Sequence, residues 1–496
     1  MRGIGISVRA IPVSVSLGFA GALFAVFGAA FITLLPTPTS FYLLGLLALM
    51  GAIAYLSVKP LLYTLYLLIL SLPLTSIFNV VLLGGHIKIS DFVTLLLIVL
   101  AAGRFVLGKC SSIRFPPATA AFILFFSLQT LSLVNYLFIP SPVRDMQGAV
   151  GFINSPQVIG IKQILWGLYS FAATVVTYGL IDRKDKLFRA MSVLFAVSVL
   201  ASAYGIIQVV GSVMGVDTGL KTTSDIWVAP RLQATSAEAG FFAAFLTMII
   251  PVSVVTYVGK AYMVNRRFHL VGVCILFAAL VMTFSSAGWL SIVVALTAVF
   301  YCLISKKYNL GQIAGKVLRF IGLAALVAIA SGIVLIPQFS LGVKEAVLTK
   351  FYGTASMTER VVWMEIALRM FLDYPVLGVG VGNYGNLFFE YVPRETPAFF
   401  HHSFTSGNLY SLTLAETGLP GTSTLILLEA AILRSIGVAA RRSDDPRMRL
   451  LLVGCLGGVI AQFVHQVAVG TFYLLYFWIF LGIALAATNL SRRDQF

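Results

Sequence analysis

The chain has 496 residues, of which 59% are hydrophobic and only 10% are charged. Soluble globular domains carry about 25% charged residues, so the composition excludes that class of protein. The formal net charge is +16, but no basic patch is interleaved with aromatic residues, which argues against nucleic-acid binding. The four cysteines form no C-x-x-C motif and no cluster with histidine. Neither a disulfide framework nor a zinc site is therefore predicted.

Apolar segments long enough to cross a bilayer, about 20 residues each, recur from end to end. They predict an all-α polytopic membrane protein with about 14 transmembrane helices (12–14) and one integral membrane domain over residues 1–496. The polar SSAG stretch at Ser285–Gly288 predicts a break between two of these helices. The predicted spans are 12–34, 41–57, 61–82, 91–108, 117–138, 161–181, 188–211, 239–258, 269–284, 288–304, 319–336, 407–433, 450–469 and 472–489.

Basic residues gather in alternate connecting segments, among them DRKDKLFR, NRRF, RRSDDPRMR and SRRD. With the N-terminus in the cytoplasm, most of the 34 lysines and arginines lie inside and most of the 18 acidic residues lie outside. This distribution follows the positive-inside rule. We therefore expect a multi-pass protein with both termini in the cytoplasm, whose high net charge reflects its topology.

The longest segment between predicted spans is 338–405, on the outer side. Within it, Ser356 and Glu359 form an S-x-x-E capping box, and apolar residues follow at helical spacing until Pro375. This pattern predicts an amphipathic helix at the outer membrane surface. The helix dipole disfavours Arg360 in its first turn, so we expect a compensating anion from a substrate or a neighbouring acid.

The glycine-rich stretch GVGVGNYG follows this helix at Gly378–Gly385. Its second half matches the dinucleotide fingerprint G-x-G-x-x-G letter for letter. That fingerprint requires a preceding strand within a βαβ unit, whereas a helix precedes it here. We predict instead a tight turn that lets the backbone approach a ligand or another helix.

A second outer loop, Thr218–Gly240, places Arg231 and Glu238 directly before an apolar helix. Charged side chains at the mouth of a span are costly unless they are functional or paired. The alternative is an interfacial anchor in which the two charges pair with each other.

The stretch AFFHHSFTSGNLYSLTLAETGLPG places His401 and His402 outside a predicted helix that contains Asn408 and Glu416. A glutamate at membrane depth is a functional candidate, although Glu416 could equally make a helix-packing hydrogen bond. The two adjacent histidines lack a third ligand at helical spacing, so no metal is expected. His465 stands alone in an apolar helix and is expected to be a core histidine with satisfied hydrogen bonds.

Three passages, in this order, resemble the O-antigen ligase and polymerase family of bacterial cell-surface polysaccharide assembly. RLQATSAEAGFFAAFLTMIIP is similar to its arginine-containing outer loop and the helix after it. TERVVWMEIALRMFLDYPVLGVGVGNY is similar to its arginine- and tryptophan-containing helix with a Pro-x-x-Gly-x-Gly turn. GNLYSLTLAETGLPG is similar to the helix that closes its large outer loop. The resemblance covers roughly residues 200–435.

The resemblance implies a GT-C-like fold and an inverting, metal-independent glycosyltransferase without cofactors in the bacterial cytoplasmic (inner) membrane. Such enzymes move a glycan from an undecaprenyl-diphosphate carrier to a sugar hydroxyl on the periplasmic face. Ligases use the lipid A core of lipopolysaccharide as acceptor, and polymerases use another lipid-linked repeat unit. The implied partners are the lipid-linked donor, a glycan acceptor, the bilayer and other polysaccharide-assembly proteins.

The family's arginines, thought to hold the diphosphate, would map to Arg231 and Arg360, with Asn408 in the same substrate site. The attacking hydroxyl needs a base or an orienting acceptor. Glu238 and one of the two histidines of the closing loop are candidates, and Glu416 could play the same part or merely hold a helix.

Two positions depart from the family pattern. Ligases commonly have a histidine directly before the asparagine of the closing helix, where this chain has Gly407. Many members also have an arginine where this chain has Ser286 or Ala287. The first departure favours a polymerase of O-antigen or exopolysaccharide repeat units over a ligase. A flippase or transporter is the alternative of another class, but its polar residues should lie at the bilayer midplane.

Overall fold

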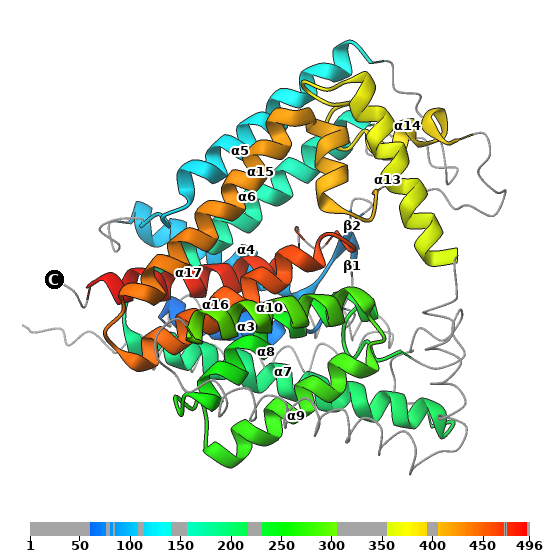
Figure 1. Ribbon diagram of the computed structural model, residues 1–496. Helices are drawn as coiled ribbons and strands as arrows, with labels where there is room; N and C mark the ends of the chain where they lie inside the picture. Colours follow the sequence, from blue (N-terminus) through cyan, green and yellow to red (C-terminus); the bar gives the residue numbers. More distant parts are fainter. Residues whose placement is uncertain are drawn as a thin grey trace, which may run out of the picture. The chain divides into compact units, whose positions relative to one another are not determined.

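The computed structural model describes residues 60–75, 80–82, 85–107, 114–139, 156–216, 231–304, 355–393, 405–470, 472 and 474–493. Its contacts divide the chain into one unit from Met1 to Thr64 and a second from Leu65 to Phe496. The packing described below is that of the second unit. Its described part is helical apart from one antiparallel hairpin of β1 (Val80–Leu82) and β2 (Gly85–Ile87) (Figure 1).

Nine helices of the described part are long and apolar enough to cross a membrane. This confirms the prediction of a polytopic helical membrane protein, while the predicted spans 12–34, 41–57 and 319–336 lie outside the described residues. The helices are α3 (Leu61–Ser71), α4 (Ile89–Val106), α5 (Thr119–Ser132), the 3-10 helix η1 (Leu133–Leu137), α6 (Pro156–Leu180), α7 (Lys184–Val213), α8 (Ala239–Val258), α9 (Arg266–Met282), α10 (Ser286–Ile304), α13 (Ala355–Asp373), α14 (Tyr384–Tyr391), α15 (Leu409–Arg442), α16 (Pro446–His465) and α17 (Leu475–Arg493).

Two predicted boundaries have different outcomes. The predicted span 61–82 is wrong in length, because α3 ends at Ser71 and is followed by Pro73, which has no backbone N–H to continue a helix. The predicted break at Ser285–Gly288 is confirmed, since α9 ends at Met282 and α10 begins at Ser286.

Helices α8, α16 and α17 are buried along most of their length. Glycines of α16 let its backbone approach α8 closely. A Cβ added to Gly454 would lie 2.6 Å from Val252 Cα, and one added to Gly458 would lie 2.4 Å from Met248 O. Small residues are the usual way for membrane helices to pack at short range. This tight pairing fixes the end of α16 relative to the start of α8.

Helix α15 is two limbs joined at Gly418, whose φ of 64° and ψ of −164° are not helical. Tyr410 on the short limb donates its hydroxyl to Glu429 Oε1 at 3.1 Å on the long limb, and contacts Phe463 O at 3.2 Å. The two limbs therefore lie side by side (Figure 1). The predicted single helix 407–433 is wrong, because the positive φ of the glycine reverses the chain direction. The reversal returns the start of α15 to the end of α16.

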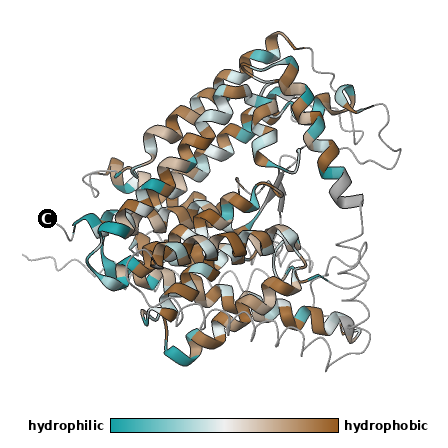
Figure 2. Ribbon diagram, viewed as in Figure 1, coloured by the Kyte–Doolittle hydropathy of each residue, from teal (hydrophilic) through white to brown (hydrophobic). Residues whose placement is uncertain are grey.

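Hydrophilic residues gather at the left of Figure 2, near the C-terminus. They include the start of α7 and of α16, which are joined by an ion pair between Lys184 Nζ and Asp445 Oδ2 at 2.8 Å. They also include Arg441 and Arg442 at the end of α15. The opposite ends of α8, α15 and α16 carry the candidate site residues described next.

Candidate functional site

The first site arginine lies in the short segment before α8. Arg231 donates from Nε to Thr283 O at 3.0 Å, and Leu232 N donates to Met282 O at 3.0 Å. These bonds attach the segment to the corner between α9 and α10. Glu238, at the other end of the segment, is the exposed N-cap residue that precedes α8. The corner thus fixes the guanidinium while the carboxylate remains accessible.

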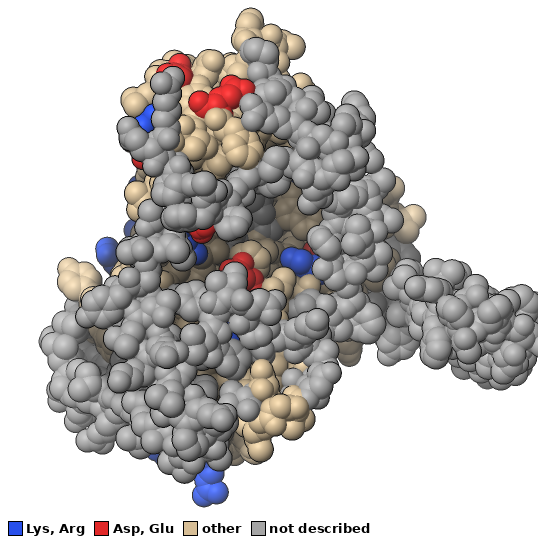
Figure 3. Space-filling model, turned by 90° about the vertical axis from the view of Figure 1, so that its right-hand side faces the viewer, with Lys and Arg blue, Asp and Glu red and all other residues tan. Residues whose placement is uncertain are grey.

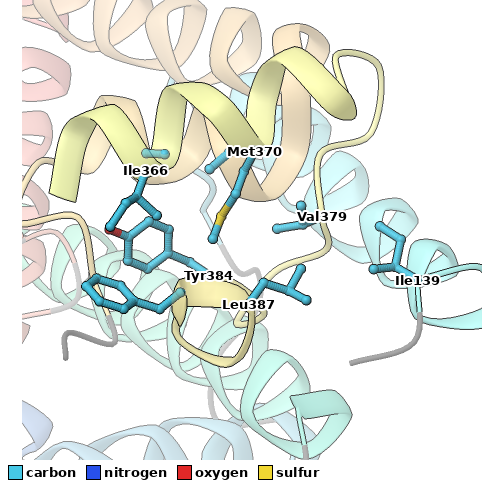
Figure 4. Packing of buried hydrophobic residues seen from close by; sticks show 9 residues of the cluster. Ile139, Ile366, Met370, Val379, Tyr384 and Leu387 are labelled. Carbon is cyan, nitrogen blue, oxygen red and sulfur yellow. The ribbon is translucent and has the colours of Figure 1, made fainter. Parts of the chain in front are cut away.

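The second site arginine, Arg360, lies on α13. This helix confirms the predicted amphipathic helix. The side chain of Ser356, the expected cap, lies outside the described residues. One face of α13 is fully buried through Ile366 and Met370, which pack against Tyr384 and other residues of the following turn and α14 (Figure 4). The Tyr384 hydroxyl also donates to Trp363 O at 2.8 Å. This packing sets the position of Arg360 one turn before Trp363.

Three charged groups from separate segments interact at this site. Burial lowers the pKa of Arg231 and Arg360, and in both cases the negative charge of Glu238 opposes that effect. Arg360 also lowers the pKa of Arg231, as two neighbouring cations must. Glu238 and Glu359 are thus the acids that compensate Arg360. Figure 3 shows acidic and basic residues of the described part side by side in a hollow of the surface.

Arg360 is further held by the turn that follows α16. Its Nη1 donates to Ala468 O. The start of α15 reaches the same turn, because Leu409 N donates to Gln466 O at 3.0 Å. Elements far apart in the sequence therefore converge on Arg360.

Asn408 caps α15, because its Oδ1 accepts from Tyr410 N at 2.9 Å and from Ser411 N at 3.4 Å. The residue before it, Gly407, has a φ of 68°. A Cβ there would lie 3.4 Å from the Trp363 ring and 3.9 Å from Arg360 Cγ. A side chain at this position would therefore point at the arginine.

Glu416 lies two turns further along the short limb of α15, about 12 Å from the start of the limb at 1.5 Å per residue. It is buried, and its carboxylate accepts from the backbone N–H groups of Gly382 and Tyr384 and from the side chain of Gln163. These contacts give Glu416 a role in joining α15 to the glycine-rich turn and to α6.

The glycine-rich turn packs directly on neighbouring helices. Gly378 has a φ of 67°, and a Cβ there would lie 2.3 Å from the Glu416 carbonyl carbon. Gly382 has a φ of 82°, and a Cβ there would lie 2.7 Å from Gly160 N. The turn is preceded by α13, and its glycines serve close approach to α15 and α6, which confirms that part of the sequence interpretation.

The candidate histidines fall into two groups. His401 and His402 lie outside the described residues. His465 is fully buried, and within the part of the chain that the structure describes neither of its ring nitrogens makes a hydrogen bond. The expected core position is confirmed, whereas the expected hydrogen bonds are not found among the described residues. The sequence does not predict the unpaired state of His465, because nothing in the apolar helix around it signals that the fold places Arg360 nearby.

Among the described residues, no group of three His, Cys, Asp or Glu side chains could hold a metal ion.

These features define a polytopic helical membrane protein with a charged site. Two arginines next to loops share one glutamate there, at the helix ends opposite the basic segments. Residues 271–426 match the family model described as O-antigen ligase. The match covers about a third of the chain, and over those residues it supports the resemblance to the O-antigen ligase and polymerase family. No curated protein matches the chain. Arg360 and Glu416 lie within the matched region, whereas Arg231 and His465 lie outside it.

Proposed function

We propose that this protein is an inverting, metal-independent glycosyltransferase that polymerises O-antigen or exopolysaccharide repeat units. It moves a glycan from an undecaprenyl-diphosphate carrier to a sugar hydroxyl at the outer face of the bacterial cytoplasmic membrane. The observation that supports this reaction is the convergence of Arg231, Arg360 and Glu238 from segments far apart in the sequence.

The leaving group explains why two arginines are needed. As the bond to the sugar breaks, negative charge grows on the diphosphate, and fixed cations aimed at that charge lower the barrier. The guanidinium fork can donate two parallel hydrogen bonds to phosphate oxygens. Backbone carbonyls of Thr283 and Ala468 orient the two forks in advance. Glu238 compensates their mutual repulsion until the donor arrives.

The distribution of charge supports the outer location. Lys184 and the arginines at the end of α15 lie at one set of helix ends, which the positive-inside rule assigns to the cytoplasm. The arginine site lies at the opposite ends of α8, α15 and α16. Substrates carried on a lipid can reach it from the outer leaflet.

The test uses purified protein in detergent, an undecaprenyl-diphosphate-linked repeat unit from the host, and EDTA. We expect a ladder of polymer on a gel without added nucleotide or metal. Transfer only after addition of lipid A core would make the protein a ligase, a change in acceptor at the same site. Absence of covalent product with both acceptors, together with flipping of the lipid-linked donor by reconstituted protein, would overturn the proposal in favour of a transporter.

A further inference from the structure

The structure describes two fully buried histidines that differ in their hydrogen bonds. His269 Nε2 lies 3.1 Å from Ser253 O, and its Nδ1 accepts from Met263 N at 3.3 Å. His465 has no such bond at either nitrogen among the described residues. An unpaired buried polar group costs about 1–3 kcal/mol, and most buried polar groups in proteins have partners. His465 is one of several buried polar groups without a partner in the described part of the chain, and its imidazole can accept a proton.

The position of His465 supplies one. Its backbone carbonyl accepts from Ala468 N at 3.1 Å and Val469 N at 3.0 Å, forming the turn whose Ala468 O holds Arg360. The Arg360 guanidinium is close enough to act electrostatically on the imidazole. A second buried donor without a partner in the described residues, Trp363 Nε1, lies one turn from Arg360. Two buried polar groups without partners in the described residues therefore belong to elements that contact Arg360 or carry it.

We infer that His465 is the catalytic base of the transfer reaction, an inference that rests on the proposed function. The acceptor hydroxyl oxygen attacks the anomeric carbon of the donor sugar and forms the new C–O bond. The C–O bond to the diphosphate breaks, and its electron pair leaves with undecaprenyl diphosphate. The hydroxyl proton passes to the unpaired ring nitrogen of His465, which later releases it to water.

The other candidate bases in the described part are already occupied. Glu416 accepts three hydrogen bonds that join α15 to its neighbours, and Glu238 compensates two guanidinium groups. The imidazole of His465 has a lone pair that no other group among the described residues engages.

The same geometry couples the base to donor binding. Arg360 contacts the turn that begins at His465 through its bond to Ala468 O, so a diphosphate bound to Arg360 would lie next to that turn. The negative charge of the donor also offsets the positive charge of the nearby guanidinium. The base is therefore sealed from water until the donor is in place, which limits wasteful hydrolysis.

The test compares His465→Phe with the matched control His269→Phe in the purified full-length protein. We expect His465→Phe to keep its melting temperature, because it removes an unpaired polar group, and to lose glycan transfer by at least about 100-fold. Its binding of undecaprenyl diphosphate should remain. His269→Phe should melt earlier, because it breaks two hydrogen bonds, and should retain transfer per folded molecule.

A further variant, His465→Gln, separates proton transfer from hydrogen bonding. If His465 is the base, His465→Gln should lose as much activity as His465→Phe. The loss should appear in kcat, with little change in KM. Near-normal transfer by His465→Phe, while the wild type makes polymer, would overturn the inference and leave the proposed function intact. Recovery of transfer by His465→Gln would also overturn it, because hydrogen bonding would then suffice. If wild-type protein forms no product, the proposed function itself fails.

Discussion

Backbone carbonyls help to orient Arg231 and Arg360. Arg231 donates to Thr283 O at 3.0 Å and Arg360 donates to Ala468 O. Thr283 is the residue that ends α9, where carbonyls are left unused by the helix, and Ala468 lies in the turn after α16. The arrangement orients the cations without neutralising them completely, which suits a site that must bind an anion.

Glu238→Gln tests the balance of charge at this site. Since Glu238 raises the pKa of both arginines, its removal leaves two cations without their shared acid. We expect a several-fold lower KM for the anionic donor, and a larger effect of salt on that KM because the site is partly exposed. Steady-state transfer at several donor and salt concentrations measures both. An unchanged KM would show that Glu238 does not influence the donor.

The site residues differ in how well the sequence alone predicts their roles. The arginines and Glu238 were predictable because charges beside an apolar helix are conspicuous. The unpaired state of His465 was not, because it depends on the fold bringing Arg360 to the end of α16. The role of Glu416 was left open by the sequence, and its three hydrogen-bond donors come from α6 and the glycine-rich turn.

At the scale of elements, Glu416 joins α15 to α6 and to the glycine-rich turn. The variant Glu416→Gln tests whether joining these elements is its function. A glutamine has only one acceptor oxygen for three donors, so we expect a loss of about 1–3 kcal/mol in stability. Transfer per folded molecule should be retained. The control is Glu365→Gln, which removes only an exposed ion pair with Arg369. Complete loss of transfer at unchanged stability would instead make Glu416 part of the chemistry.

The glycine-rich turn carries the second element-scale prediction. Gly382→Ala adds a methyl group at a φ of 82° and only 2.7 Å from Gly160 N. We expect a stability loss of about 1–3 kcal/mol or more from backbone strain and the clash. Gly437→Ala is the control, because nothing lies within 4 Å of its added Cβ and alanine favours the helix. Thermal unfolding in detergent compares the two, and equal melting temperatures would contradict the described packing.

Elements also differ in how well the sequence predicts them. Hydropathy located α8 at its observed bounds, Ala239–Val258, because an apolar run fully surrounded by other helices has clear ends. Hydropathy could not reveal that α15 reverses at Gly418, since both limbs are apolar. The chain reverses at the non-helical Gly418, and the hydrogen bond from Tyr410 to Glu429 holds the two limbs together.

At the scale of the whole molecule, the account requires the arginine site and the basic helix ends to face opposite sides of the membrane. In a background without native cysteines, Ala237→Cys next to Glu238 should react with a membrane-impermeant maleimide in intact spheroplasts. Asp444→Cys, before α16, should react only after permeabilisation. Both positions are exposed in the structure. Labelling of the two variants under the same condition would contradict the proposed orientation.

The most direct test of the central claim is glycan polymer in the host strain carrying Arg231→Ala or Arg360→Ala, at matched levels of membrane-inserted protein. Arg369→Ala is the control, because this α13 arginine is exposed and paired only at the surface with Glu365. If both site arginines stabilise the departing diphosphate, each alanine variant should lose polymer synthesis by about 10²–10³-fold while the control keeps it. Normal polymer in either site variant would contradict the role assigned to that arginine.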